Sequence, residues 1–572
     1  MRWTHGPGTT AEAAEEGARL AAEFGLRAPT GRVLWARGHR DAKAVERFLE
    51  PKLDQLPNPF ELKAIEPAVE RLCKALREKE KICVYGDYDV DGVTSTVLLV
   101  STLRKLGGVV DYYVPHRLIE GYGLNSEAMG KLAARGTRLV VSADCGVTAV
   151  AEVDAAARLG LDVVVIDHHT ASQDLPRAVA ILNPHQPGCT FPGRELAAVG
   201  VAFHLLLALR RRLREQGFFA NRKEPNLREA LDLVALGTIA DVVPLTGANR
   251  VLVTFGLREL SKAERPGIAA LKKVAQLDGP VTAGDVGFKL GPRINAAGRL
   301  DDAAVGVKLL LTEDHVEARK LAEELDRANA ERQDLQARIA GEAMERAAQL
   351  GPPEERRTLV VWAPGWHVGV VGIVASRLVD RFHRPAVVLA EEGGVAKGSG
   401  RSVEGFHLYD ALARCSTHLS RFGGHKHAAG MQLPVSGLKA FSDALEAEAR
   451  TTLDPSQLIP RVRIDAYLEA SEVGPELAHE LQRLSPFGAG NPEPVFMCKA
   501  LQANEVRLLP DKRGSGPGHL KLSLTNGLDA IGFGLGAMAL AQATPFDAAF
   551  QLSIDKWRDV ERVQLKLKDM VL

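Results

Sequence analysis

Short apolar runs alternate with longer amphipathic stretches between residues 61 and 310. The runs are rich in Val, Ile, Leu and Tyr, and they lie at residues 82–85, 111–114, 139–142 and 162–166. Runs of this length and composition are typical of buried parallel strands. The stretches between them predict helices at residues 67–78, 93–106, 126–135 and 148–159. Because strands and helices alternate, the sequence predicts an α/β domain built on a doubly wound parallel sheet.

Two helical regions flank this domain. A segment at residues 1–60 contains Ala- and Glu-rich stretches at 11–24 and 41–49, which predict a small helical segment at the start of the chain. Residues 313–350 contain no Pro and a single Gly, which predicts one long helix. We expect this helix to form a connecting segment, residues 311–352, between two domains.

The last third of the chain predicts two more domains. Residues 353–455 have the pattern of a second α/β unit. Its strands and helix are predicted at residues 358–362, 385–390 and 369–382. From residue 456 to residue 572 the pattern changes to strict alternation of apolar and polar residues, as at 519–524 and 563–567. Alternation with turns between the runs predicts a small antiparallel β barrel.

The composition narrows the class of protein. The 72 basic and 72 acidic residues give a formal net charge of zero, which excludes a strongly basic DNA-coating protein but not a local basic channel. Six cysteines without any CxxC spacing predict reduced packing residues of a cytosolic protein. The first residues lack the apolar region of a signal peptide, and no stretch approaches about 18 uncharged apolar residues. We therefore expect neither secretion nor a membrane span.

Acidic and histidine residues follow the apolar runs at equivalent places. They are Asp87, Asp89, Asp91, Asp144, Asp167, His168, His169 and Asp241. We interpret the apolar run at 235–240, which precedes Asp241, as a strand like the others. Because the carboxyl ends of parallel strands meet at one edge of a sheet, we expect these side chains to converge there. Crowded carboxylates and imidazoles repel and desolvate one another unless cations hold them, so the sequence predicts a metal centre.

The ligand types indicate which metal. Oxygen-rich ligands with one or two His suit Mn²⁺ or Mg²⁺ better than Zn²⁺, which prefers thiolate and His. More carboxylates than one cation needs indicate two cations that share a bridging carboxylate, an arrangement used for in-line attack on phosphate esters. Asp167 can serve as a partner that orients an imidazole instead of binding metal.

Plainer interpretations exist for each motif alone. The Asp-x-Asp-x-Asp-Gly pattern at 87–92 resembles a calcium loop, but the twelfth position is Leu98 where such a loop has Glu. A polar turn after a strand is another interpretation of the same residues. A single buried His is more often a hydrogen-bonded core residue than a ligand. The recurrence of Asp and His after several runs favours the metal centre over these alternatives.

Six motifs carry a resemblance to a known family. They are GDYDVDG at 86–92, ADCG at 143–146, DHH at 167–169, ADVVPL at 240–245, GPRINAAGRL at 291–300 and GGHKHAAG at 423–430. The chain resembles the DHH phosphoesterase family over nearly its whole length, and within that family the single-strand-specific 5′→3′ exonucleases. The resemblance implies a DHH catalytic domain at 61–310, a DHHA1 domain at 353–455 and an OB-like β barrel at 456–572.

The same resemblance implies a set of site residues and partners. The implied metal ligands are Asp89, Asp91, Asp144, His168 and Asp241, and the implied catalytic residues also include Asp87 and His169. Several relatives have a His four residues before the first ligating Asp, where this chain has Tyr85. The implied partners are single-stranded DNA bound at its 5′ end, single-strand-binding protein, and recombination or mismatch-repair proteins. The implied setting is a monomer in a bacterial cytoplasm.

Polar and basic residues elsewhere are candidates for gripping phosphate. They are Arg117, Arg293, Asn295, Arg299, Lys397, Ser399, Arg401, Ser402, His425 and His427. Gly-rich backbone around residues 398–402 can form an anion nest, and arginine forks suit phosphate oxygens. By resemblance, a pocket of such residues holds the terminal 5′ phosphate. A solvated surface turn is the alternative for either Gly-rich segment, and the basic run at 210–214 is interpreted as an exposed helix face.

These features together predict a metal-dependent exonuclease. It acts on single-stranded DNA from the 5′ end and releases 5′-mononucleotides by a two-metal mechanism, with a closed groove between two α/β domains that excludes duplex. Other DHH phosphoesterases, such as nanoRNases, cyclic-dinucleotide hydrolases and polyphosphatases, are an alternative, as is a non-catalytic DHH scaffold for replication or repair. No GK[ST] motif occurs, so ATP hydrolysis is disfavoured.

Overall fold

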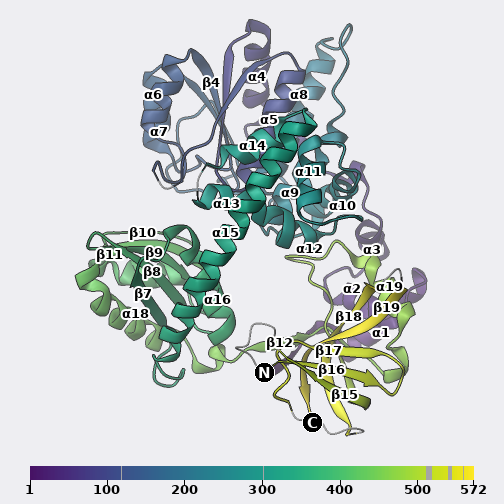
Figure 1. Ribbon diagram of the computed structural model, residues 1–572. Helices are drawn as coiled ribbons and strands as arrows, with labels where there is room; N and C mark the ends of the chain where they lie inside the picture. The colour runs from purple at the N-terminus through teal and green to yellow at the C-terminus, as the bar shows by residue number, and fades with distance from the viewer. Residues whose placement is uncertain (118, 301, 511–517, 539–543, 558–559) are drawn as a thin grey trace. The chain divides into compact units, whose positions relative to one another are not determined.

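The computed structural model describes residues 1–572 except 118, 301, 511–517, 539–543 and 558–559 (Figure 1). The described chain forms two compact units. The larger unit contains Leu53–Leu458 and Gly488–Asn491, and the smaller unit contains Met1–Lys52, Ile459–Phe487 and Pro492–Leu572. The domain boundaries predicted from the sequence define finer parts than these two units and remain predictions.

The first half of the larger unit is built on a parallel sheet. Its strands are β2 (Lys81–Gly86), β3 (Val109–Tyr113), β4 (Thr137–Ala143), β5 (Asp162–Ile166) and β6 (Ala180–Leu182). They lie in the order β3-β2-β4-β5-β6, and every neighbouring pair is parallel. The chain runs outward from β2 to β3 and then places β4 on the other side of β2, so the sheet has a topological switch point between β2 and β4. This arrangement confirms the doubly wound α/β fold class.

Helices cover both faces of this sheet. They are α4 (Ile65–Glu78), α5 (Val90–Lys105), α6 (Ser126–Ala134), α7 (Val150–Arg158), α8 (Ala198–Glu215) and α9 (Leu231–Ala240). Ile82 and Val84 of β2 pack into the core formed with α4, α5, α8 and α9, whereas Cys83 and Tyr85 pack into the core formed with α6 and α7. Successive strand residues point to opposite faces, so a strand between two helical layers is apolar at nearly every position.

The predicted strand before Asp241 is wrong, because residues 235–240 form the end of helix α9. Every residue from Leu231 to Ile239 is buried, and α9 packs against α5, α8 and α10 (Gly247–Lys262). A helix buried on all sides has no polar face, so its sequence shows the same unbroken apolar run as a buried strand. Asp241 therefore reaches the site from the carboxyl end of a helix.

More helices continue the larger unit and lead to its second half. They are α11 (Pro266–Val274), α12 (Ala283–Asp285), the π-helix Val286–Leu290, α13 (Gly291–Leu300), α14 (Ala304–Leu311) and α15 (His315–Ala348). Helix α15 has 34 residues, which at 1.5 Å per residue is about 51 Å. It contacts α11, α13 and α14 and also β7 and α16 of the second half, as expected for the predicted connecting helix.

The second half of the larger unit contains a mixed sheet in the order β10-β11-β9-β8-β7. Its elements are β7 (Leu359–Pro364), α16 (Val368–Phe382), β8 (Ala386–Glu392), β9 (Val395–Arg401), α17 (Leu408–Arg414), β10 (Arg421–Gly424), β11 (Ala428–Pro434) and α18 (Leu438–Thr452). Most of the two Gly-rich segments, for which a solvated surface turn was the alternative to phosphate binding, is strand here. Strand β9 lies in the middle of the sheet, paired along its length with β8 and β11. Its backbone groups belong to the sheet ladder, so the predicted anion nest is wrong.

The smaller unit is built on a seven-stranded sheet in the order β13-β14-β18-β19-β17-β16-β15. Its strands are β13 (Ala466–Tyr467), β14 (Phe496–Leu501), β15 (Ala503–Leu509), β16 (His519–Leu524), β17 (Asp529–Gly532), β18 (Phe546–Trp557) and β19 (Val560–Val571). The pairs β13–β14 and β17–β19 are parallel, so the sheet is mixed and not purely antiparallel as predicted. The reason is that β19 pairs with β18 on one side and β17 on the other, which brings together strands that are distant in sequence.

The start of the chain belongs to the smaller unit. Helices α1 (Ala11–Glu23), α2 (Ala28–Ala36), α3 (Ala42–Leu49) and α19 (Pro475–Leu481) share one hydrophobic core with the seven-stranded sheet. Strand β1 (Arg2–His5) pairs in parallel with β12 (Arg461–Ile464). The sequence predicted the helices at 11–24 and 41–49 but showed no sign of this pairing, since both strands are only four residues long.

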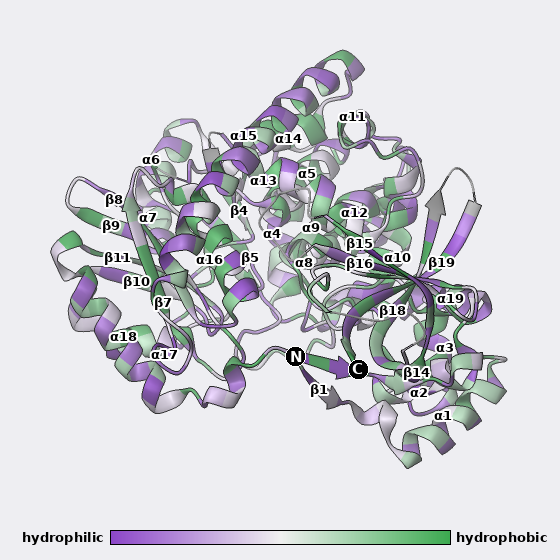
Figure 2. Ribbon diagram, turned by 60° about the horizontal axis from the view of Figure 1, so that its bottom comes forward, coloured by the Kyte–Doolittle hydropathy of each residue, from purple (hydrophilic) through white to green (hydrophobic). Residues whose placement is uncertain are grey.

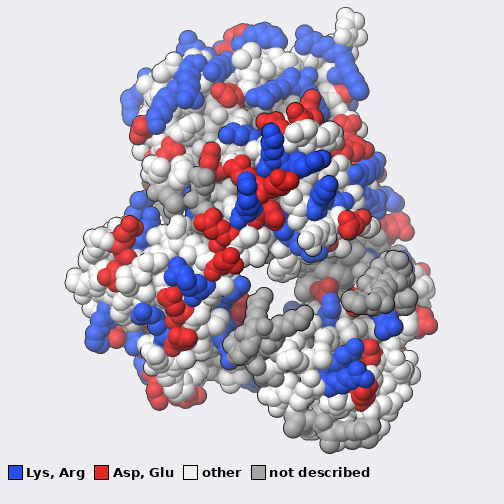
Figure 3. Space-filling model, viewed as in Figure 1, with Lys and Arg blue, Asp and Glu red and all other residues white. Residues whose placement is uncertain are grey.

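Hydrophobic and charged residues are mixed in the views of Figures 2 and 3. In Figure 2 the helices α15 and α16 show both hydrophobic and hydrophilic residues, as expected for helices with one face in a core. On the face shown in Figure 3, Lys and Arg are interspersed with Asp and Glu, in keeping with the zero net charge. None of the helices in the described part of the chain combines the length and hydropathy needed to cross a membrane.

Candidate metal centre

Asp87 and Asp89 lie in the turn between β2 and α5, and Asp91 lies in the first turn of α5. Asp89 is the N-cap of α5, and its side chain accepts hydrogen bonds from the backbone N–H groups of Asp91 at 2.9 Å and Gly92 at 3.1 Å. Gly86 and Gly92 make the turn possible, because a Cβ atom on Gly86 would lie 2.0 Å from the Thr96 hydroxyl oxygen and one on Gly92 2.6 Å from a backbone oxygen. The motif therefore forms a tight strand-to-helix turn at the carboxyl edge of the sheet, as predicted.

The other predicted residues reach the same edge from three further elements. Asp144 follows β4 with a backbone φ of 66°, a left-handed conformation that is uncommon for a residue other than glycine. His168 and His169 follow β5, and Asp241 is the C-cap of α9. The switch point between β2 and β4 thus brings residues of distant segments to one place.

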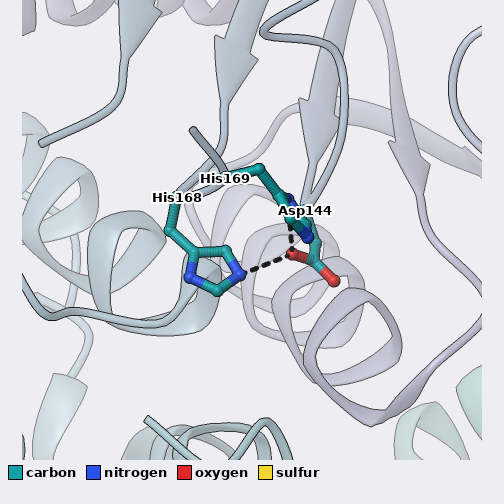
Figure 4. A group of neighbouring side chains, drawn as sticks. All are labelled: Asp144, His168 and His169. Atoms are coloured by element: carbon teal, nitrogen blue, oxygen red, sulfur yellow. Dashed lines mark ion pairs between the residues drawn. The ribbon is translucent and has the colours of Figure 1, made fainter. Parts of the chain in front are cut away.

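Three overlapping groups of ligand atoms result, each with all its atoms within 4.8 Å of one another. The groups are Asp144 with His168 and His169, Asp91 with His168 and Asp241, and Asp87 with Asp89 and Asp144. The Nε2 atom of His168 lies 3.3 Å from Asp144 Oδ1, 3.4 Å from Asp241 Oδ2 and 4.0 Å from Asp91 Oδ2. Figure 4 shows both imidazole rings directed toward the Asp144 carboxylate. All seven residues predicted as catalytic therefore lie together.

The centre has little solvent and a surplus of negative charge. Asp87, Asp91 and Asp144 are at most 3% exposed. Burial raises the pKa of Asp144 well above its usual range, and repulsion from the neighbouring aspartates adds to the rise. Burial raises the pKa of Asp91 to about 7 and that of Asp241 to about 9, again with contributions from neighbouring carboxylates. The carboxylates therefore lack the solvation and the counter-charges that would hold them ionised.

Several atoms in the centre also lack hydrogen-bond partners. Within the described residues, no hydrogen bond reaches Asp87 Oδ1, Asp144 Oδ1, His168 Nε2 or Asp241 Oδ2, although all four atoms are buried. Buried polar atoms are normally paired, and a cluster of unpaired acceptors at one point is what a cation would satisfy. Burial, with His169 adding to its effect, lowers the pKa of His168 to about 4, so its imidazole is neutral and able to bind metal. The residues present therefore fit divalent cations.

Backbone donors fix the orientation of Asp91. Its carboxylate accepts N–H hydrogen bonds from Ala198 at 2.7 Å and Val199 at 2.9 Å, in the first turn of α8, where the helix dipole also favours a negative charge. Nothing in the sequence marks this contact, because the Ala-Val-Gly stretch at 198–200 has no polar side chain. These bonds hold the Asp91 carboxylate in place beside His168 and Asp241.

Asp167 has the orienting role expected for it. It accepts N–H hydrogen bonds from Val147 at 2.9 Å, His168 at 2.8 Å and His169 at 3.0 Å, and its Oδ1 lies 2.7 Å from His169 Nδ1. Burial alone would raise the pKa of Asp167, but these bonds hold it below its usual value. Burial likewise would lower the pKa of His169, but Asp167 raises it to about 9.

A cluster of guanidinium groups lies beside the acidic centre, and we call it the arginine cluster: Arg117, Arg299 and Arg401. Burial lowers the pKa of Arg299 to about 10, and the positive charges of Arg117, Arg332 and Arg401 contribute to the fall. Arg401 donates a 2.7 Å hydrogen bond to the Ser399 hydroxyl, and a Cβ atom on Gly372 of α16 would lie 3.1 Å from Arg401 and 3.3 Å from Ser399. None of the ion pairs formed among the described residues involves these three arginines. The arginine cluster is thus suited to bind an anion.

Other predicted phosphate-binding residues have structural roles. Arg293 is ion-paired with Asp326 of α15 at 2.9 Å and donates to the Lys289 carbonyl, so it does not join the arginine cluster. The Asn295 side chain accepts the backbone N–H of Val90 at 3.1 Å and so supports the start of α5. Both residues therefore have structural partners, and a role for them in binding phosphate stays a prediction.

The remaining candidates divide in the same way. The Ser402 hydroxyl donates to the Phe406 carbonyl at 2.8 Å and stabilises a turn. Lys397 is exposed on β9, on the same face as Ser399 and Arg401 by strand alternation. The His425 ring stacks on His169 with centroids 6.5 Å apart, whereas His427 is exposed and its carbonyl accepts the Ser402 N–H. The structure therefore brings His425 but not the His427 ring to the metal centre.

The chain is similar to proteins of known family. Three family models match it: the DHH family, N-terminal domain, at residues 81–238, the DHHA1 domain at 356–451 and the RecJ OB domain at 464–569. The single-stranded-DNA-specific exonuclease RecJ of Dickeya dadantii is 43% identical over 553 residues, which cover 93% of this chain and 94% of that protein.

Two solved structures are similar over the whole chain. RecJ of Thermus thermophilus in complex with Mn²⁺ is similar with a TM-score of 0.84 and 32% identity, covering 100% of this chain and 79% of that chain. The structure of the same protein in complex with Mg²⁺ gives a TM-score of 0.79 and 31% identity, covering 100% of this chain and 78% of that chain.

Proposed function

This chain belongs to the RecJ family of DHH-domain proteins, and we propose on that premise that it is a hydrolase that degrades single-stranded DNA from the 5′ end and releases 5′-mononucleotides. One observation supports this above the others. Seven acidic and histidine side chains converge in a centre where four buried polar atoms have no hydrogen-bond partner among the described residues. Phosphodiester hydrolysis requires charge stabilisation of this kind around the reacting phosphate.

The acidic centre would hold two divalent cations, Mn²⁺ or Mg²⁺. Asp91, His168 and Asp241 form one ligand group and Asp87, Asp89 and Asp144 form another, while Asp144 belongs to two groups and is suited to bridge. When bound, such cations would supply an activated water and neutralise charge on the phosphate. The two Thermus thermophilus structures are complexes with Mn²⁺ and with Mg²⁺, which supports the same choice of metals here.

The arginine cluster would set the polarity of degradation. Arg117, Arg299 and Arg401 would bind the terminal 5′ phosphate, and the Ser399 hydroxyl would add a further hydrogen bond. Two contacts support a location beside the metal centre: Arg117 lies 4.8 Å from the centroid of the Tyr88 ring, and a Cβ atom on Gly298, next to Arg299, would lie 2.8 Å from the Tyr88 carbonyl oxygen. A 5′ end bound beside the metal centre would present the first phosphodiester to it. His169, held by Asp167 through Nδ1, would direct its other ring nitrogen toward the substrate.

The larger unit would select single-stranded over double-stranded DNA by its width. A passage between the DHH and DHHA1 parts, which meet at α13 and α16, would admit one strand and exclude duplex. From family membership we also propose that single-strand-binding protein and recombination or mismatch-repair proteins are its partners, and that it works as a monomer in a bacterial cytoplasm. Size-exclusion chromatography with light scattering and co-purification with single-strand-binding protein would test this part.

The main test is digestion of end-labelled DNA by the purified protein with Mn²⁺, with Mg²⁺ and with EDTA. We expect labelled mononucleotide from a 5′-labelled single strand with either cation, no product with EDTA, and little product from blunt duplex. A panel from dinucleotide to long 5′-phosphorylated DNA separates this activity from that of other DHH phosphoesterases. Preferential cleavage of the dinucleotide, or equal cleavage of duplex and single strand, would contradict the proposal.

A further inference from the structure

The segment between β3 and α6 places a tyrosine hydroxyl inside the metal centre. The Tyr122 hydroxyl lies 3.2 Å from the carbonyl oxygen of Asp144 and 3.3 Å from His169 Nδ1. Its ring packs edge-on against His169, with centroids 5.9 Å apart, and against Tyr88, with centroids 6.3 Å apart. The residue as a whole is 54% exposed. Although the residue is partly exposed, its hydroxyl is directed toward two residues of the metal centre.

Hydrogen-bond directions give this hydroxyl a defined role. The Asp144 carbonyl can only accept, so the Tyr122 hydroxyl donates its proton there. His169 Nδ1 lies 2.7 Å from the acceptor-only carboxylate of Asp167, so Nδ1 is the protonated ring nitrogen. The same N–H also faces the Tyr122 oxygen at 3.3 Å, which can accept it as the second acceptor of a bifurcated hydrogen bond. Tyr122 and Asp167 together therefore hold the His169 ring from one side and leave Nε2 as the nitrogen available to substrate.

The backbone around Tyr122 and Asp144 supports the same interpretation. Gly121 and Gly123 have φ angles of 84° and 88°, conformations that favour glycine, and they allow the chain to turn Tyr122 inward. Asp144 itself has a φ of 66°, so the carbonyl that Tyr122 pins belongs to a strained turn bearing a candidate ligand. The backbone conformations of Gly121, Gly123 and Asp144 thus bring the Tyr122 hydroxyl and the Asp144 carbonyl together.

The same segment also reaches the arginine cluster. The Arg117 guanidinium lies 4.8 Å from the centroid of the Tyr88 ring, and Tyr88 stands between Asp87 and Asp89 in the sequence. One short segment therefore contributes both to the arginine cluster and to the support of His169.

We propose that Tyr122 is a positioning residue that orients His169 for the hydrolytic reaction. This inference rests on the proposed nuclease function. Tyr122 would act through His169 and not by contact with the reacting atoms, since its hydroxyl is engaged by the Asp144 carbonyl and by His169 Nδ1. Loss of the hydroxyl would leave the ring contacts with Tyr88 and His169 in place and release one of the two restraints on the imidazole.

The test compares Tyr122→Phe with a control, Tyr409→Phe, in steady-state digestion of 5′-phosphorylated single-stranded DNA. Tyr409 is an exposed residue of α17 whose ring packs on Phe422, and its substitution should leave kcat and KM unchanged. For Tyr122→Phe we expect kcat to fall about tenfold or more, as for other residues that orient a site histidine, with KM within about twofold of wild type. The urea midpoint of unfolding should stay that of wild type, because the phenyl ring keeps its packing.

A double-mutant cycle distinguishes orientation from a separate effect. In a His169→Gln background there is no imidazole to orient, so Tyr122→Phe should cause little further loss of kcat. The same fold-loss in both backgrounds, an unchanged kcat in the single variant, or a loss that parallels a lower urea midpoint would overturn the inference. A wild-type protein that does not cleave single-stranded DNA would instead refute the proposed function, and an active wild type with an active Tyr122→Phe would refute the inference alone.

Discussion

Replacement of Asp144 by Asn should stabilise the metal-free protein and destroy its activity. Asp144 is 2% exposed, its Oδ1 has no hydrogen-bond partner among the described residues, and its carboxylate lies within 4.8 Å of those of Asp87 and Asp89. Asn removes the charge at nearly constant volume. It also tolerates the left-handed φ of 66° better than Ala, which would add strain of its own.

The magnitude follows from the charge separation. Two unit charges 4.8 Å apart repel by about 3 kcal/mol at an effective dielectric constant of about 20. Because a proton shared among the carboxylates relieves part of this repulsion, we expect a gain of about 1–2 kcal/mol in the free energy of unfolding in EDTA. At a urea slope of about 3 kcal/mol/M the midpoint should rise by about 0.5 M. With metal, wild type should be more stable than the variant. A free cation concentration of about 100 times the Kd stabilises the protein that binds it by about 2.7 kcal/mol, and the variant should lose most of this stabilisation.

The assay is urea unfolding of both proteins in EDTA and in excess MnCl₂, followed by fluorescence and circular dichroism. We expect the variant to be the more stable protein in EDTA and the less stable one with Mn²⁺. A variant that unfolds at lower urea than wild type in EDTA would show that the centre is not strained by unpaired charge, and the case for cations would fail. Full nuclease activity of the variant would remove Asp144 from the mechanism.

The remaining predictions concern pH, substrate and folding. Folding raises the pKa of Asp241 to about 9, so the stability that this residue contributes is fully present below the ordinary pKa of an aspartate and is lost as the pH rises through 9. The free energy of unfolding of the metal-free protein, measured with urea, should therefore fall from pH 7 to pH 9, and Asp241→Asn should make this fall smaller. Arg401→Ala should abolish the preference for 5′-phosphate over 5′-hydroxyl ends, while Arg414→Ala, on the exposed α17–α18 surface, should keep it; equal preference in both variants would refute the phosphate role. Gly86→Ala places a Cβ atom 2.0 Å from a hydroxyl of α5 and should cost about 1–3 kcal/mol in unfolding free energy. Gly341→Ala, exposed on α15 with nothing within 4 Å, should instead gain about 0.5–1 kcal/mol, and similar losses in both would contradict the packing argument.

The parallel sheet and the convergence of its acidic residues could be predicted because both depend on local pattern. A strand buried on both faces must be apolar throughout, and the residue after it must turn, so Asp87 and Asp144 were found by position alone. The apolar run before Asp241 was wrongly predicted as a strand, since a fully buried helix and a buried strand have the same apolar pattern. The place of Asp241 at the site was still predicted, because it follows an apolar run as Asp87 and Asp144 do, and the family motif includes it.

Non-local pairing set the limit of the sequence analysis. Gly398 and Gly400 predicted an anion nest or a surface turn, yet they lie in β9, where the neighbouring strand approaches closely: a Cβ atom on Gly398 would lie 2.0 Å from the Val388 carbonyl oxygen. Similarly, β1 has no periodic signal in four residues and exists through its pairing with β12. Arg293 and Arg299 lie on the same helix, and only tertiary contacts reveal that Arg293 binds Asp326 while Arg299 joins the arginine cluster.

The separation of the two clusters bears directly on function. The arginine cluster and the acidic centre lie close together, since the Arg117 guanidinium lies 4.8 Å from the centroid of the Tyr88 ring, and Tyr88 stands between Asp87 and Asp89 in the sequence. No ion pair among the described residues joins them, although direct pairing would relieve both. Each cluster therefore keeps a charge that a ligand of opposite sign can neutralise. A phosphate bound by the arginines adds negative charge beside the acidic centre and should tighten cation binding there, and by linkage the cations tighten the phosphate by the same factor. The cost of this unpaired charge in the free protein is the physical reason to expect both ligands together.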